Sequence, residues 1–170
     1  IDRIAVTTGP GTFTGVRIGL AFARGLGLAR GIAVIGIDSL SAIAANDSAA
    51  APLLVVSDAR NGEVYAATYD AARNLVSAPH VSTTASASAG QPPGTIVLGS
   101  AASAVIAESG RFDLGHSSEC PVPVAARFAW LAATAEARSM PEPLYLRAPD
   151  AKPQASSLRR FGNITVERAG

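Results

Sequence analysis

The chain has 170 residues, 48% of them hydrophobic and 16% charged, with a formal net charge of +1, which predicts one ordinary domain or two small lobes with a buried core. Its basic residues are scattered, so the sequence argues against autonomous nucleic-acid binding, and no apolar run approaches the roughly 20 residues of a membrane-spanning helix. A single cysteine, Cys120, and the lack of a secretory signal predict a cytoplasmic protein.

The first part of the chain predicts a βαβ unit followed by a helix. Apolar residues 4–8 predict a strand, residues 14–30 a helix, and residues 32–38 a second strand that is nearly all apolar, as in a buried parallel sheet. Ser39 is expected to cap a second helix through about Ala45.

A linker and a hairpin follow. Residues 46–52 have the composition of a linker, which places a lobe boundary there. Residues 53–60 and 63–70 predict two strands joined by Asn61-Gly62, a dipeptide whose tolerance of positive φ suits a two-residue hairpin turn.

The second half of the chain predicts an irregular segment and then strand and helix again. Residues 81–94, rich in Ser, Ala, Thr and Pro, predict an irregular surface segment. Residues 95–99 predict a buried strand that leads into a helix over residues 100–109.

One more helix precedes the C-terminal end. Spacing predicts a helix over residues 124–138, stopped by Pro141 and Pro143, with residues 144–147 as a short docking segment. Its core face is expected to hold Val124, Phe128, Leu131 and Ala135.

The turn Gly9-Pro-Gly-Thr-Phe-Thr-Gly15 connects the first predicted strand to the first helix. Glycines let such a turn bend sharply, and the free N–H groups that open a helix can receive an anion or a polar partner. The candidate phosphate-facing residues are Gly9, Gly11 and Thr12. A Walker A loop is excluded because no lysine follows any glycine, the sole lysine being Lys152.

A dinucleotide site at the same turn stays open as an alternative. Gly9, Gly11 and Gly15 follow a strand, and Asp38 ends the next strand. The spacing, however, is Gly-x-Gly-x-x-x-Gly rather than Gly-x-Gly-x-x-Gly.

The helix after the turn is predicted to bury two faces. Gly15, Gly19 and Ala23 form a ridge of small residues that another helix could approach, beside an apolar ridge of Ile18, Phe22 and Leu26. Two arginines on a largely apolar side suggest a partner that supplies carboxylates, the alternative being an ordinary half-exposed helix. The predicted partner interface is Phe13, Thr14, Arg17, Ile18, Ala21, Phe22, Arg24 and Gly25.

The sequence predicts no catalytic residues, no metal site and no cofactor. His80 and His116 are far apart and form no metal-binding motif. Cys120 leaves a Cys/His nucleophile open as an alternative. The charges beside the Asn-Gly turn are interpreted as solvating the hairpin: Asp58, Arg60 and Glu63.

Several stretches, in order, resemble the TsaB (YeaZ) family. The most specific is Gly9-Pro-Gly-Thr-Phe-Thr-Gly-Val-Arg-Ile-Gly19, which departs from the family only at Thr12, where serine is expected. The others are residues 25–29, 34–40, 58–65, 97–100 and 143–147, so the resemblance covers residues 1–147.

This resemblance implies an α/β, actin-like, Hsp70-like ATPase (ribonuclease H-like) fold of two lobes. The lobes are expected at residues 1–48 and 49–147, with residues 148–170 as a C-terminal tail. Family members begin with strands that this chain lacks, so the first lobe is expected to be N-terminally truncated and the strand at residues 4–8 to have an open edge.

The resemblance also implies a function. Its members are non-catalytic subunits that bind TsaD in the complex that forms threonylcarbamoyladenosine on tRNA, together with TsaE. A homodimer is expected where TsaD is absent, and contact with tRNA only indirectly. Two alternatives remain: a nucleotide- or dinucleotide-binding enzyme that uses the turn at residues 9–15, and a glycoprotease-like peptidase.

Overall fold

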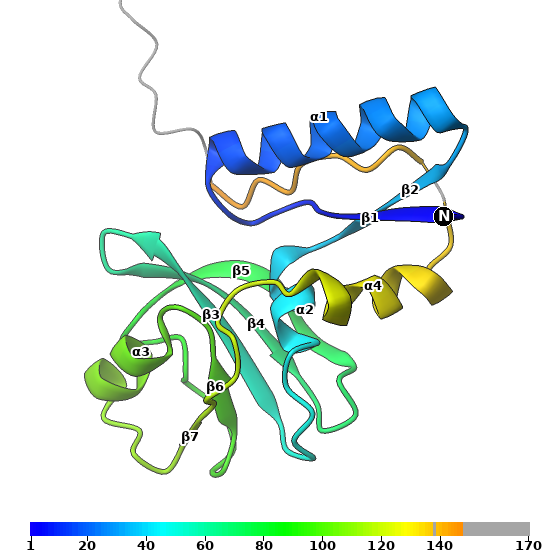
Figure 1. The fold of residues 1–170 in the computed structure, drawn as a ribbon. Coiled ribbons are helices and arrows are strands. Elements are labelled where there is room, and N and C mark those ends of the chain that lie inside the picture. Colours follow the sequence, from blue (N-terminus) through cyan, green and yellow to red (C-terminus); the bar gives the residue numbers. More distant parts are fainter. Residues whose placement is uncertain (138, 148–170) are drawn as a thin grey trace, which may run out of the picture.

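The chain forms two β-sheets, a small one near the N-terminus and a larger mixed one, with helices around them (Figure 1). The computed structural model describes residues 1–137 and 139–147. The small sheet pairs β1 (Arg3–Thr7) with β2 (Ala33–Ile37) in parallel, and in the described part of the chain β1 pairs with no other strand. The predicted tail lies outside the described residues.

Helices cover both faces of the small sheet. α1 (Phe13–Arg30) lies on one face and α4 (Ala125–Thr134) on the other (Figure 1). The core between α1 and the sheet contains Val6, Leu20, Ala23 and Val34. The predicted βαβ unit is therefore confirmed, with each boundary within one residue of its expected place.

α1 can lie this close to the sheet because of Gly27. A Cβ at this position would stand 2.4 Å from Val34 Cγ2 and 2.9 Å from the Ile32 carbonyl oxygen. Any side chain there would push the helix away from β2.

α2 (Ser39–Ala44) is buried between the two sheets. Its N-cap is Asp38, whose Oδ1 accepts a hydrogen bond from the Ser41 N–H at 2.8 Å. The prediction that Ser39 is the cap is wrong, because Ser39 is already helical while Asp38 keeps the extended backbone that a capping residue needs.

The five-stranded sheet has the order β5-β4-β3-β6-β7. β3 (Leu53–Arg60) and β4 (Glu63–Tyr69) form the predicted hairpin, and Asn61 and Gly62 take positive φ angles of 56° and 74°. At the centre of the sheet, Leu53, Leu54, Val55 and Val56 have no exposed surface. The hairpin prediction is confirmed.

Two strands of this sheet were not predicted. β5 (Leu75–Thr83) pairs with β4, so residues 81–83 belong to a strand and the irregular segment starts only after them. β7 (Gly115–His116) is a two-residue strand beside β6 (Ile96–Leu98). Both are edge strands, whose pairing depends on backbone groups and leaves little hydrophobic pattern in the sequence. α3 (Ala102–Ser109) follows β6 as expected.

α4 is shorter than predicted. It ends at Thr134, before Pro141 and Pro143, because Ala135 already has extended backbone. Its buried residues are Phe128 and Ala132, whereas Leu131 is 39% exposed, so the prediction that Leu131 lies in the core is wrong. Residues four apart in a helix lie on one face, and α4 contacts the sheet with the face that carries Phe128 and Ala132. Leu131 lies beside that face.

Residues 139–147, here called the strap, return to the small sheet and run along α1 (Figure 1). A division at residue 48 therefore does not follow the two sheets, because α4 and the strap pack with the first one. No helix among the described residues is long and apolar enough to cross a membrane.

Candidate partner-binding face

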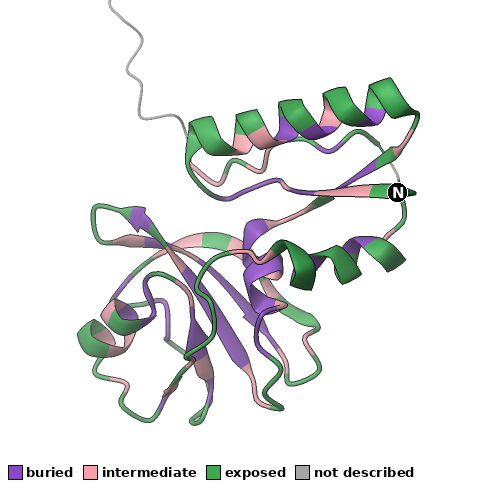
Figure 2. Cartoon of the chain, viewed as in Figure 1, coloured by how far each residue is buried: buried purple, intermediate pink, exposed green. Residues whose placement is uncertain are grey.

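The side of α1 that points away from the sheet is apolar and exposed to solvent (Figure 2). Ile18 is 65% exposed and Phe22 73% exposed. The only charged residues of the helix are arginines 17, 24 and 30, and helical spacing places them away from the line through Ile18 and Phe22. We call this surface the outer face: Thr14, Ile18, Ala21, Phe22, Gly25, Leu26 and Ala29.

Of the ridge of small residues, Gly15 is exposed, while Gly19 and Ala23 lie on the side of α1 that faces the sheet. Ala23 is 4% exposed, and a Cβ on Gly19 would stand 3.9 Å from Val6 Cγ2. The expectation that Gly19 and Ala23 receive a second helix is therefore wrong, because the chain's own sheet occupies that side. The apolar ridge through Ile18 and Phe22 is the one that remains open.

The two arginines that share a side of α1 have different surroundings. Arg24 is half-buried, and its Nε and Nη2 both donate to the Pro141 carbonyl oxygen, the Nε at 3.0 Å. Arg17 is exposed, and its Nε donates to the Tyr145 hydroxyl at 2.7 Å. Its Cζ lies 3.5 Å from the ring centroid of Phe13.

The strap that holds these arginines is also attached in its middle and at its last described residue. The Leu144 N–H donates to the Thr8 carbonyl oxygen at 2.8 Å. Arg147 Nη1 lies 3.0 Å from Glu63 Oε2 and donates to the Ala59 carbonyl oxygen at 3.2 Å, which joins the strap to the hairpin. Residues 144–147 do dock, as predicted, and they dock on the chain itself.

The glycine turn is partly closed. Gly9 is buried, and its carbonyl oxygen accepts from the Ser39 N–H at 2.7 Å. Gly11 and Thr12 are exposed and line a cavity of about 470 Å³ that also touches Arg60 and Arg147. The phosphate hypothesis for this turn thus concerns Gly11 and Thr12.

The residues of the alternative functions are used elsewhere or lie apart. Asp38, the acidic residue of the dinucleotide hypothesis, caps α2. Cys120 is exposed, and among the described residues no hydrogen bond joins its thiol to a histidine: His116 Nε2 lies 3.3 Å from the Ser103 hydroxyl, and His80 Nδ1 is within hydrogen-bonding distance of a backbone carbonyl. Within the described ranges, no group of three His, Cys, Asp or Glu side chains could hold a metal ion.

The charges at the hairpin turn make structural contacts, one within the hairpin and one to the strap. Asp58 Oδ1 accepts from the Arg60 N–H at 2.8 Å, and Glu63 pairs with Arg147. These contacts agree with a structural rather than a catalytic role for Asp58, Arg60 and Glu63.

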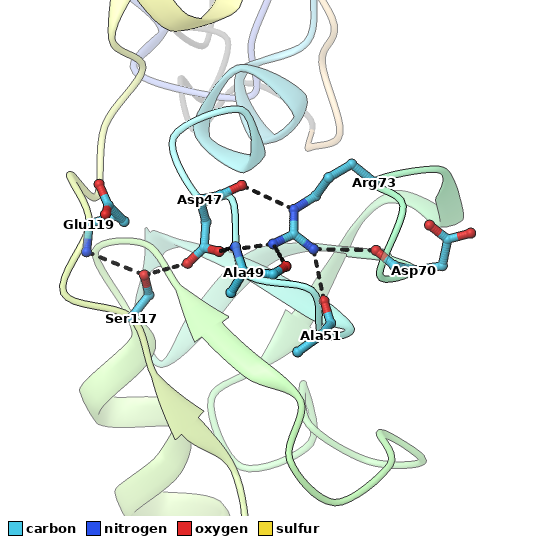
Figure 3. A network of polar contacts seen from close by, with 7 residues as sticks. All are labelled: Asp47, Ala49, Ala51, Asp70, Arg73, Ser117 and Glu119. Carbon is cyan, nitrogen blue, oxygen red and sulfur yellow. Dashed lines mark hydrogen bonds and ion pairs between the residues drawn. The ribbon is translucent and has the colours of Figure 1, made fainter.

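A buried polar network that the sequence did not predict lies at the base of the large sheet (Figure 3). Asp47 is 7% exposed, and its carboxylate accepts from the Ala49 N–H, Arg73 Nη2 and the Ser117 hydroxyl at 2.8, 2.8 and 2.7 Å. Burial alone would raise the pKa of Asp47, but the hydrogen bonds from Ser117 and Ala49 and the Arg73 guanidinium outweigh it and lower that pKa below its usual range.

Asn46, next to Asp47, secures the return of the chain to the small sheet. Its Nδ2 donates to the carbonyl oxygens of Cys120 and Val122, each at 2.8 Å. The sequence contained one signal for this pair: the polar run Asn46-Asp-Ser48 inside an alanine-rich segment that otherwise resembles a linker.

Comparison with known proteins identifies relatives for most of the chain. Residues 1–129 match the model of the family described as TsaD, tRNA N6-adenosine threonylcarbamoyltransferase. A Mycobacterium tuberculosis protein of unassigned function is 38% identical over 159 residues, which cover 91% of this chain and 68% of that protein. The Escherichia coli tRNA threonylcarbamoyladenosine biosynthesis protein TsaB is 42% identical over 77 residues, 44% of this chain and 33% of that protein. The solved structure of YeaZ from Pseudomonas aeruginosa matches with a TM-score of 0.64 and 26% identity, covering 86% of this chain and 74% of that one.

Proposed function

We propose that this chain, a member of the TsaB (YeaZ) branch of the TsaD family, acts as a non-catalytic subunit in tRNA threonylcarbamoyladenosine biosynthesis. It has the actin-like, ribonuclease H-like α/β fold of that family. In this role the outer face of α1 packs against TsaD, TsaE joins the larger complex, and tRNA is reached through TsaD.

The observation that carries the proposal is the outer face. Its two large side chains, Ile18 and Phe22, are 65% and 73% exposed. Burying a side chain of this size contributes about 1.5–3 kcal/mol to the free energy of binding. Ile18 and Phe22 would thus contribute as much as the few residues that dominate the affinity of a typical protein interface. Exposed apolar patches rimmed by polar side chains mark interaction sites, and here an arginine stands at the rim.

The same surface supports the expected homodimer. A twofold dimer buries the same patch on both copies, so two chains could cover their outer faces by packing α1 against α1 when TsaD is absent. Binding of TsaD and self-association would then exclude each other, since both need Phe22 covered.

The test replaces Phe22 in the full-length protein. Phe22→Asp places a charge where the proposal buries an apolar ring, so the affinity for the TsaD protein of the same genome should fall by at least about 100-fold, equivalent to about 2.8 kcal/mol. Binding is measured by titration calorimetry, and circular dichroism checks the fold. The matched control is Phe112→Asp, since Phe112 is 80% exposed and lies between α3 and β7, outside both α1 and the strap.

Equal binding by the Phe22 and Phe112 variants would refute the role of the outer face. Loss of binding in both variants would point to unfolding or to a different surface, and thermal melts separate these two explanations.

The cavity beside Gly11 and Thr12 favours one second candidate, nucleotide binding. It combines exposed backbone at the start of α1 with Arg60 and Arg147, groups that suit a phosphate. Calorimetric titration with ATP, ADP and NAD tests this candidate. Micromolar binding that is lost in Arg60→Ala would support an enzyme or nucleotide binder, and no heat from any of the three nucleotides would reject it.

A further inference from the structure

The strap gives Arg17 and Arg24, two of the three arginines of α1, different surroundings. Arg24 uses two of its nitrogens on the Pro141 carbonyl oxygen and is half-buried, so its hydrogen-bonding capacity serves the chain's own packing. Arg17 is exposed and uses only Nε, which donates to the Tyr145 hydroxyl. Helical spacing makes these two residues equivalent, and only the strap distinguishes them.

Arg17 is held from two sides. Its guanidinium lies over the Phe13 ring, 3.5 Å from the centroid, and 5.7 Å from the centroid of Tyr145. The two rings are themselves stacked, with centroids 5.6 Å apart and an interplanar angle of 28°. A guanidinium stacked on an aromatic face with Nε bonded to a hydroxyl has few orientations left.

This arrangement leaves the outer edge of the guanidinium available. Neither Nη group of Arg17 has a hydrogen-bond acceptor in the described part of the chain, and no described carboxylate pairs with it. Two Nη donors in a fixed plane match the two oxygens of a carboxylate, which is the ligand geometry that arginine binds best.

We propose that Tyr145 positions Arg17 to receive a carboxylate of the docking partner, so that the binding surface continues from the outer face of α1 onto the strap. This inference rests on the proposed function and names the chemistry of the partner at one point: an aspartate or glutamate side chain beside an apolar patch. Because Arg17 is already ordered, less side-chain entropy is lost when the carboxylate binds.

The energetic signature of such a positioning residue is coupling. Tyr145→Phe keeps the ring that stacks on Phe13 but removes the hydroxyl that holds Nε. If Tyr145 acts only through Arg17, its hydroxyl matters while Arg17 is present and not after Arg17 has been removed.

A double-mutant cycle on the full-length protein with TsaD tests this. Tyr145→Phe should weaken binding about 2- to 10-fold, the effect of one hydrogen bond. Arg17→Ala should weaken it further and make binding less sensitive to salt, and Tyr145→Phe on that background should change nothing more. Arg17→Lys should restore only part of the affinity, since an ammonium cannot form the paired contact. Arg127→Ala, which removes an exposed cation from α4, is the control for loss of charge.

The outcomes are distinct from those of the broader proposal. Multiplicative effects of the two substitutions, or full affinity in Tyr145→Phe, would overturn the positioning role even where Phe22→Asp abolishes binding. If Phe22→Asp binds normally, the docking surface itself is wrong and this inference fails with it.

Discussion

Replacing Asp47 by asparagine is the most informative test of how the molecule is held together. The substitution keeps the size of the side chain but removes its charge and turns one of its two oxygen acceptors into a donor. In the native protein these oxygens receive three hydrogen bonds, from Ala49, Arg73 and Ser117, at 2.7–2.8 Å. The variant must leave at least one of these donors without its partner.

The cost follows from these contacts. A hydrogen bond to a charged group contributes about 1.5–3 kcal/mol, and breaking a buried ion pair costs up to about 3–5 kcal/mol. The surroundings of Arg73 reduce this loss of stability, because its side chain is 21% exposed to water. It also donates to backbone carbonyl oxygens of Asp47, Ala49 and Ala51. We therefore expect a loss of about 2–3 kcal/mol in the free energy of unfolding at pH 7.

The pH dependence identifies the carboxylate as the cause. The folded-state pKa of Asp47 is lowered, so the ionised carboxylate contributes stability above the pKa of the unfolded chain, which is near 3.8. That contribution is lost as the pH falls through the still lower folded-state pKa. The difference in stability between wild type and variant should thus be constant from pH 7 to about pH 5 and should shrink below about pH 4.

Urea unfolding followed by circular dichroism at pH 7, 5, 4 and 3.5 measures this difference. The matched control is Asp113→Asn, because Asp113 also pairs with an arginine at 2.7 Å but its side chain is 40% exposed, so solvent screens the pair and the loss should be clearly smaller. An Asp47→Asn effect no larger than that of the control, or one that is independent of pH, would refute the reasoning.

Two further predictions concern close packing and the strap. Gly99→Ala should destabilise the protein by about 3 kcal/mol or more, because a Cβ at this φ of +124° would lie 2.0 Å from the Val56 carbonyl oxygen in buried β3. Gly94→Ala, at a φ of +78° with open space around it, should cost only about 1–2 kcal/mol, and urea unfolding of both variants compares the two costs. Equal costs would argue against the clash. Arg24→Ala should release the strap and speed limited proteolysis within residues 139–147, which mass spectrometry of the fragments detects. Cleavage no faster than in Arg127→Ala would contradict the anchoring role of Arg24.

The elements that could be predicted are those whose signals are local. The βαβ unit follows from a run of apolar residues, a helix with a 3.6-residue period and a second apolar run, and each of these is decided within about 20 residues. The hairpin follows from Asn61-Gly62 for the same reason, because the turn's backbone preference acts on its nearest neighbours. Strands β5 and β7 could not be predicted, because an edge strand is stabilised by hydrogen bonds to the backbone of its neighbour. Those hydrogen bonds leave no recognisable pattern of side chains in the sequence.

For the candidate site, the sequence by itself determined the composition of α1: an uncharged apolar stripe, small residues at fixed intervals and two arginines seven positions apart. Only the tertiary structure decided which stripe faces the sheet, so that Gly19 and Ala23 are inside while Ile18 and Phe22 are outside. It also decided that one arginine is held by Pro141 and the other by Tyr145. The strap lies more than 100 residues further along the chain, and helical periodicity holds no information about a segment that arrives from so far away.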